Sequence, residues 1–278
     1  MDRAWFQRLN LEYDEPLSNF AFNFNLRPYT EGGRLEVLRW ARERDRMWTP
    51  WDEWQTLDVA ICKHAARGGQ VEVLKWLREQ GCPWDESTCT AAAIGGHLEV
   101  LKWARVHGCP WDDKTCAMAA MWGMLEVLQW AREHHCPWGA YTCARAAGAG
   151  QLETLRWARE HGCPWDQFTT EYAAEGGHLA VLTWAWEHDC PCDELTCAAA
   201  AEFGRLDVLV WLREHGCPWD RRTGIRAANR GHGDVLLWVR EHDCPGVDED
   251  DTDDHDSWGD SEGASDDSEG LSDADVAE

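Results

Sequence analysis

The chain has 278 residues, among them 20 Trp, 13 Cys, 51 Asp or Glu and 26 Lys or Arg, for a formal net charge of −25. This length is enough for one or two domains with a sizeable core. So acidic a composition argues against a nucleic-acid binder, which needs a basic face for phosphates. No apolar run is long enough for a membrane span, and the N-terminus lacks the apolar segment of a secretory signal. We therefore expect a cytoplasmic protein, with the nucleus as an alternative, in a reducing compartment.

The first 30 residues are rich in aromatic side chains and precede any complete repeat. Phe20, Phe22 and Phe24 alternate within the segment from Trp5 to Tyr29. Such a cluster can cover the exposed apolar end of a helical array, where the terminal unit has no neighbour. We interpret residues 1–30 as an N-terminal capping region.

Residues 31–245 contain a strict internal repeat. Tryptophan recurs every 27 residues, and a Cys-Pro pair recurs at the same interval. The columns are Trp76, Trp103, Trp130, Trp157, Trp184, Trp211 and Trp238, and Cys82, Cys109, Cys136, Cys163, Cys190, Cys217 and Cys244. An additional copy from Glu31 to Glu43 stands 36 rather than 27 residues before the copy of Trp76, so nine residues are inserted there. Self-similarity at a fixed period of this length indicates a solenoid of stacked units.

The unit from Thr88 to Lys114 predicts two helices. The first, around Thr88 to Ile94, is rich in alanine and ends at Gly95. The second, around His97 to His107, places apolar residues at i, i+3 and i+4 on one face. A glycine after this helix in four copies, followed two residues later by proline, predicts its end. Because one such hairpin cannot bury its apolar face alone, we predict about seven stacked helix pairs.

At these residues the unit resembles the ankyrin repeat. The sequence A-A-I-G-G-H-L-E-V-L-K-W, from Ala92 to Trp103, is similar to that family's A-A-x-x-G-H-x-E-V-V-K-L. The sequence G-C-P-W-D, from Gly108 to Asp112, stands where the family has G-A-D-V-N. The resemblance implies an all-α, ankyrin-like solenoid that binds proteins, and the Trp- and Cys-rich form looks like copies in giant DNA viruses and some protists. Because the family repeat has about 33 residues and this one is shorter, we expect little or no β-hairpin between units.

The spacing of His and Cys leaves a zinc-binding array as an alternative. Each unit has His-x-Cys-x6-Cys, as at His107, Cys109 and Cys116, whereas structural zinc sites use cysteine pairs two to four residues apart. Thr170 and Gly224 replace the second cysteine in two copies. Equivalent cysteines on stacked helices lie about 8–10 Å apart, which is too far for a disulfide. We interpret the cysteines as buried thiols and predict neither a metal nor another cofactor.

The other repeated columns have structural explanations. A histidine at the end of a second helix, such as His107, can cap carbonyl groups there. The tryptophans have the helical spacing of core residues rather than of a base-stacking platform. Because no G-x-S-x-G, H-E-x-x-H or G-x-x-x-x-G-K-[ST] motif occurs, we predict that the protein is not an enzyme.

Positions that vary while the frame stays fixed are candidates for partner binding, because the specificity of a solenoid lies outside its framework columns. They fall in the turn and first helix of successive units. The candidates are Lys114, Met118, Met121, Trp122, Tyr141, Arg145, Phe168, Glu171, Tyr172, Glu194, Leu195, Glu202, Phe203, Arg221, Arg222, Arg226 and Arg230. For Met121, Trp122 and Phe203 the alternative is that they fill gaps under a stacked helix. The four arginines form either a solvated face or a basic patch that receives an acidic segment of a partner or of the chain's own tail.

Residues 246–278 form an acidic tail with almost no apolar side chains. From Asp248 to Glu278 there are 15 Asp or Glu and no Lys or Arg, a composition that predicts disorder. We predict a monomeric, non-catalytic protein–protein interaction module that presents a rigid solenoid surface to a protein partner, with no direct nucleic-acid or membrane contact. The alternative is that the acidic tail drives binding to basic proteins.

Overall fold

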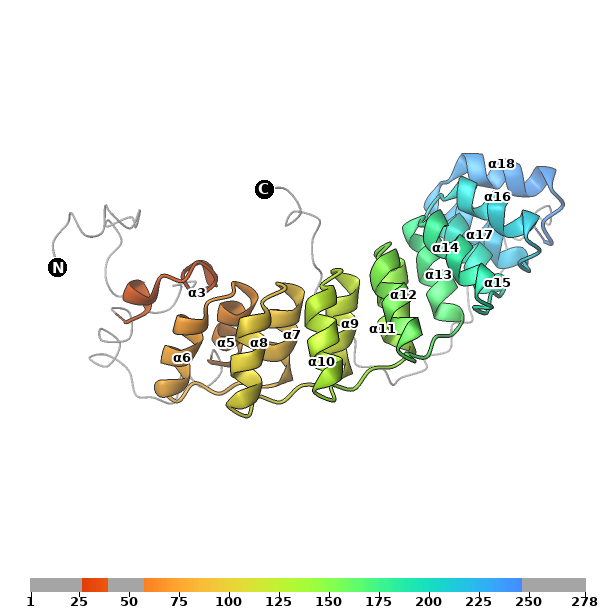
Figure 1. Cartoon of the computed structure of the whole chain (residues 1–278). Coiled ribbons are helices and arrows are strands. Elements are labelled where there is room, and N and C mark those ends of the chain that lie inside the picture. The colour runs from red at the N-terminus through yellow and green to blue at the C-terminus, as the bar shows by residue number, and fades with distance from the viewer. Residues whose placement is uncertain (1–26, 40–57, 247–278) are drawn as a thin grey trace, which may run out of the picture. The chain divides into compact units, whose positions relative to one another are not determined.

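The computed structural model describes residues 27–39 and 58–246, in which helix pairs stack side by side (Figure 1). The first helices of the pairs are α5 (Asp58–Arg67), α7 (Glu86–Ile94), α9 (Asp113–Met121), α11 (Ala140–Gly148), α13 (Gln167–Gly176), α15 (Glu194–Glu202) and α17 (Arg221–Arg230). The second helices are α6 (Val71–Glu79), α8 (Leu98–Val106), α10 (Leu125–Glu133), α12 (Leu152–Glu160), α14 (Leu179–Glu187), α16 (Leu206–Glu214) and α18 (Gly233–Glu241). The predicted all-α solenoid of seven helix pairs is confirmed. Within the described ranges there is no strand, as expected for the shortened repeat.

Two shorter helical segments precede the seven pairs. Helix α3 (Arg27–Glu31) packs against α5, and residues 35–39 are also helical. They belong to the incomplete copy identified near Glu31. Most of the predicted cap, the nine-residue insertion and the acidic tail from residue 247 lie outside the described residues.

The first helix of each unit begins after the last residue of the Cys-Pro-Trp-Asp turn. The Oδ1 atom of Asp85 accepts a hydrogen bond from the backbone N–H of Ser87 at 3.0 Å. At α15, Asp193 and Thr196 form a reciprocal capping box. Because an N-cap satisfies backbone N–H groups that have no partner within the helix, these contacts fix the start of α7 at Glu86, two residues before the predicted start.

After each second helix, one residue adopts left-handed backbone and ends the helix. Glycine has this conformation in the four copies predicted, namely Gly81, Gly108, Gly162 and Gly216, with φ between 78° and 86°. The other three copies place His135, Asp189 and Asp243 there, with φ of 65°, 60° and 57°. Left-handed backbone is unfavourable for residues with a Cβ atom, so these three copies carry local strain.

Replacing His135 with glycine is therefore expected to raise the free energy of unfolding by about 1 kcal/mol. The reverse change, Gly108→Ala, is expected to lower it by a similar amount. A Cβ atom at Gly108 would have no neighbour within 4 Å, so backbone conformation alone determines that effect. Urea denaturation of both variants checks the pair. Equal stability of Gly108→Ala and the parent chain would contradict the assigned strain.

Buried alanines let the first helices approach closely, and aliphatic side chains of the second helices cover them. Ala119 and Ala120 in α9 are fully buried, as is Leu128 in α10. Contacts between neighbouring first helices are the main connection between units. Together these side chains form one continuous hydrophobic core that passes from unit to unit, which is how a solenoid compensates for the small core of each repeat.

The columns of cysteine are buried and most act as small hydrophobic residues with a weak donor. The Sγ atom of Cys109 donates to the backbone carbonyl of Asp85 at 3.3 Å, and Cys136 makes the equivalent bond to Asp112. Burial raises the pKa of the Cys197 thiol to about 12. Thiols in such surroundings stay protonated and unreactive. Eleven free cysteines in the described residues are buried, which confirms the prediction for them.

The prediction that all cysteines are thiols is wrong for one pair. Cys192 and Cys217 form a disulfide, with their Cα atoms 6.0 Å apart. The spacing argument compared equivalent cysteines of successive repeats, but Cys192 belongs to neither cysteine column. It occupies the tryptophan position of the Cys-Pro-Trp turn, so its side chain reaches the first cysteine column of the next unit, within the range for a disulfide.

Two negative observations concern the described part of the chain alone. None of its helices has the length and apolar character needed to cross a bilayer. None of its His, Cys, Asp and Glu side chains gather in threes at a place suited to a metal ion, so nothing there supports the zinc-binding alternative.

Candidate partner-binding face

The first helices have a buried stripe and an outward stripe. In α9, Thr115, Cys116, Ala119 and Ala120 are buried, while Lys114 is exposed. The same division recurs every 27 residues in the neighbouring first helices. We call the residues opposite the buried stripe, from α9 to α17 and their C-caps, the first-helix face. Its composition changes in every unit, although the buried stripe is nearly constant.

Every predicted partner-binding residue lies on these five helices or at their C-caps. Helix α9 and its C-cap carry Lys114, Met118, Met121 and Trp122, α11 carries Tyr141 and Arg145, α13 carries Phe168, Glu171 and Tyr172, α15 and its C-cap carry Glu194, Leu195, Glu202 and Phe203, and α17 carries Arg221, Arg222, Arg226 and Arg230. Trp122, Tyr141, Phe168 and Phe203 are 38–46% exposed. Trp122 and Phe203 are therefore not buried gap-fillers, whereas Met121 is half-buried.

Arg145 joins α9 and α11 on this face. Its Nη2 atom lies 2.7 Å from the Sδ atom of Met121, and its guanidinium lies 5.6 Å from the ring centroid of Tyr141. The Nε atom of Arg145 is buried without a hydrogen-bond partner among the described residues. The cation is thus held mainly by a thioether and an aromatic ring, which stabilise it less than a carboxylate would.

Helix α13 carries two partly buried carboxyl groups, Glu171 and Glu175. Burial raises the pKa of Glu171, and the negative charge of Asp193 adds to this effect. Burial also raises the pKa of Glu175, followed in effect by the charge of Glu202. The Oε2 atom of Glu171 is buried without a hydrogen-bond partner among the described residues. Both carboxylates therefore carry a desolvation cost that no ion pair within the described residues offsets.

Tyr172 lies between these carboxyl groups along α13, and its pKa is raised, first by burial and then by Tyr141. Gly148 allows its close approach to α11, because a Cβ atom at Gly148 would lie only 3.1 Å from the Cβ of Tyr172. The ring of Phe168 lies 6.4 Å from that of Tyr172. Aromatic rings therefore flank the two carboxylates on one helix.

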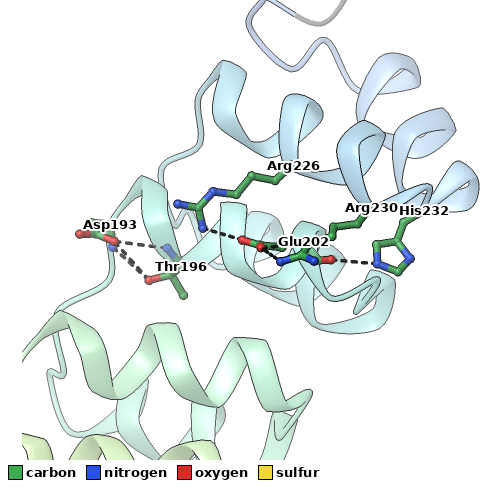
Figure 2. Close-up of polar contacts among 6 residues, drawn as sticks. All are labelled: Asp193, Thr196, Glu202, Arg226, Arg230 and His232. Atoms are coloured by element: carbon green, nitrogen blue, oxygen red, sulfur yellow. Dashed lines mark hydrogen bonds and ion pairs between the residues drawn. The ribbon is translucent and has the colours of Figure 1, made fainter. Parts of the chain in front are cut away.

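The arginines of α17 are largely engaged by carboxylates of the array (Figure 2). Both oxygens of Glu202 are used: Arg226 Nη1 donates to Oε2 at 3.0 Å, and Arg230 Nη2 donates to Oε1 at 2.8 Å. His232 Nε2 lies 2.8 Å from the backbone carbonyl of Glu202. Glu202 is therefore a counter-ion that links α15 to α17.

The hypothesis of a free basic patch consequently needs correction. Arg222 also has a carboxylate partner, since its Nε atom lies 2.7 Å from Asp220 Oδ2. Three of the four arginines are thus neutralised within the array, and Arg221 is the one that forms no ion pair with another described residue. The spacing of these arginines could not show this, because their partners are the N-cap before α17 and the end of the preceding first helix.

Sequence reasoning did not single out Glu175. A signal for it was present, because Glu175 follows Glu171 by four residues on a helix and therefore lies on the same stripe. Its equivalents in other units are Met121, Gly148 and Glu202, so the position varies as strongly as those that were chosen.

The second helices carry a different, nearly invariant surface. The guanidinium of Arg105 lies 4.2 Å from the ring centroid of Trp111, which meets Trp130 of the next unit edge to face at 5.9 Å. His134 stacks on Trp130 at 4.1 Å, and its Nδ1 atom lies 2.8 Å from the Trp130 carbonyl. The predicted capping role of the histidines is confirmed. The tryptophans pack against the core yet remain half-buried, so the prediction of core packing holds in part.

This Arg–Trp–Trp–His ladder changes at one unit through a paired replacement. Trp186 stands in the arginine column, and Cys192 stands in the tryptophan column. The indole of Trp186 meets Trp211 edge to face at 6.3 Å, the contact that the missing tryptophan would otherwise make. The smaller Cys192 reaches Cys217 instead. The ladder is therefore a framework in which loss at one position is compensated at another.

Comparison with known proteins gives a structural likeness only. No protein-family model and no curated protein matches the sequence. Among solved structures, the chain is similar to the crystal structure of the human ASB11 ankyrin repeat domain, with 17% identity and a TM-score of 0.48, over 64% of this chain and 96% of that chain. At this level of similarity nothing about partners carries over, so the function has to be inferred from the residues of this chain.

Proposed function

We propose that the protein is a non-catalytic protein-interaction module that binds a protein partner through its first-helix face. One observation carries this proposal: the outward positions differ in every unit, while the core, the caps and the ladder repeat. Successive equivalents of Lys114 are Tyr141, Phe168, Leu195 and Arg222. A fixed backbone holds these side chains in place before binding, which reduces the entropy lost when a partner binds.

The exposed aromatic residues of this face are the expected anchors, because such side chains dominate binding energy at protein interfaces. We expect Trp122→Ser/Tyr141→Ser/Phe168→Ser to weaken partner recovery at least roughly tenfold in affinity purification from a cell lysate. The matched control is Val106→Ser/Leu237→Ser, which removes apolar side chains that are 82% and 61% exposed on second helices. Equal recovery by the parent chain and the aromatic variant would refute the proposal.

The acidic tail remains a second candidate on the basis of its composition. From Asp248 onward it supplies 15 carboxylates without a basic residue, a chemistry that attracts basic proteins. The full chain with these residues changed to Asn and Gln separates the two functions. Partners retained by that variant and lost by the aromatic variant bind the first-helix face, whereas the opposite result assigns them to the tail.

A further inference from the structure

We propose that helix α13 binds a basic segment of the partner protein, in which an arginine takes the carboxylates of Glu171 and Glu175 as its counter-ions. The inference rests on the proposed function, because it names the kind of partner that the first-helix face accepts. It depends on the local charge balance, the burial of these carboxylates and the aromatic rings beside them.

The charge balance around α13 is negative. Glu171 lies near Asp193, and Glu175 lies near Glu202. The neighbouring cations are already committed: Arg226 to Glu202, and Arg145 to Met121 and Tyr141. An external cation is therefore the element that would complete this part of the face, and an acidic segment would meet like charges.

Burial adds to the expected gain. A carboxylate that has already lost part of its hydration has less left to lose when a partner covers it. The buried Oε2 atom of Glu171 has no donor within the described residues, and a guanidinium can supply one. Glu171 and Glu175 are one helical turn apart, so a forked, planar donor group can approach both.

The aromatic rings favour arginine over lysine. Tyr172 lies between the two glutamates in sequence, and Phe168 packs near it at 6.4 Å. A guanidinium stacks on aromatic faces and forms bidentate hydrogen bonds with carboxylates, whereas an ammonium is a strongly hydrated point charge. The predicted partner segment therefore contains arginine next to apolar residues that contact the exposed ring of Phe168.

Selection from a displayed library of short random peptides on the full-length chain tests this inference. We expect the selected peptides to be enriched in arginine and to bind Glu171→Gln/Glu175→Gln at least roughly tenfold more weakly. The matched control is Glu126→Gln/Glu153→Gln, which removes two exposed carboxylates from second helices and is expected to leave binding unchanged.

Unfolding of the variant can be separated from loss of the site. Because burial raises the pKa of both carboxyl groups in the folded state, their ionised forms lower stability at neutral pH, and this cost disappears as falling pH protonates them. Glu171→Gln/Glu175→Gln is therefore expected to melt at a higher temperature than the parent at pH 7, with a smaller difference under acidic conditions. Weaker binding by a more stable chain identifies a binding role rather than a structural one.

Three results would overturn the inference. Selected peptides could lack arginine enrichment, could bind the glutamine variant as tightly as the parent, or could be acidic and depend on Arg221. If the peptides nevertheless require Trp122, Tyr141 and Phe168, the proposed function stands and only the partner chemistry is wrong. If no peptide is enriched, or if binding is insensitive to those aromatic residues, the proposed function fails with it.

Discussion

Replacement of Leu128 by alanine is expected to lower the free energy of unfolding by about 2–5 kcal/mol. Leu128 is fully buried in α10, and its equivalents Leu101 and Leu155 are fully buried in the neighbouring units. The change removes apolar contacts and leaves a cavity. Because each unit is stabilised only by its neighbours, the weakened interfaces lie in the middle of the stack. Urea denaturation followed by circular dichroism measures the effect.

Leu237→Ala provides the control for this prediction. Leu237 is 61% exposed in α18, the last second helix, and the same chemical change there is expected to alter stability by less than about 0.5 kcal/mol. Solenoids can unfold in more than one step, so the slope of each transition has to be compared with that of the parent. A similar loss in both variants would show that the stack does not bury Leu128 as described.

Reduction of the Cys192–Cys217 disulfide is expected to lower the free energy of unfolding by about 3–4 kcal/mol. The bond closes a loop with a sequence separation of 25, and cross-linking a loop of this size restricts the unfolded chain. The covalent link joins the turn after α14 to the turn after α16, so α15 and α16 are expected to be the helices most affected. Thermal unfolding with and without a reductant measures the loss.

The variant Cys192→Ser separates this effect from a general effect of the reductant. Its stability is expected to match that of the reduced parent and to stay unchanged when reductant is added. Alkylation of the unreduced, denatured parent followed by mass spectrometry should modify 11 of the 13 cysteines. Modification of all 13 would show that the chain carries only thiols and would restore the first interpretation of its cysteines.

Most of the fold could be predicted from the sequence, because the signals for it are local and repeated. Gly108 and Pro110 stop a second helix through backbone constraints that act within a few residues, and a mistake in one unit is corrected by six others. The Cys192–Cys217 disulfide could not be predicted in this way. It depends on one exception to the pattern, and reasoning from the shared columns does not cover an exception.

The candidate face could be predicted only as a set of positions. Variation among units placed residues such as Tyr141, Phe168 and Glu171 on one face, because equivalent residues of a repeat occupy equivalent places. Which of them are available depends on contacts between units. Glu202 neutralises Arg226 from a position 24 residues away, and Glu171 lacks such a partner. Pairing of this kind is set by side-chain reach across the stack, which spacing along one helix does not show.

The short range of the contacts has a consequence for how such a protein changes over generations. The thiol of Cys109 reaches back 24 residues to Asp85, and Trp111 reaches forward 19 residues to Trp130. A duplication or deletion of 27 codons joins equivalent positions and restores every contact of this type, so the array can be lengthened or shortened by recombination without new compensating substitutions. The segment from Trp186 to Cys217 is the exception, because its substituted indole and its disulfide join two successive units that must be inherited together.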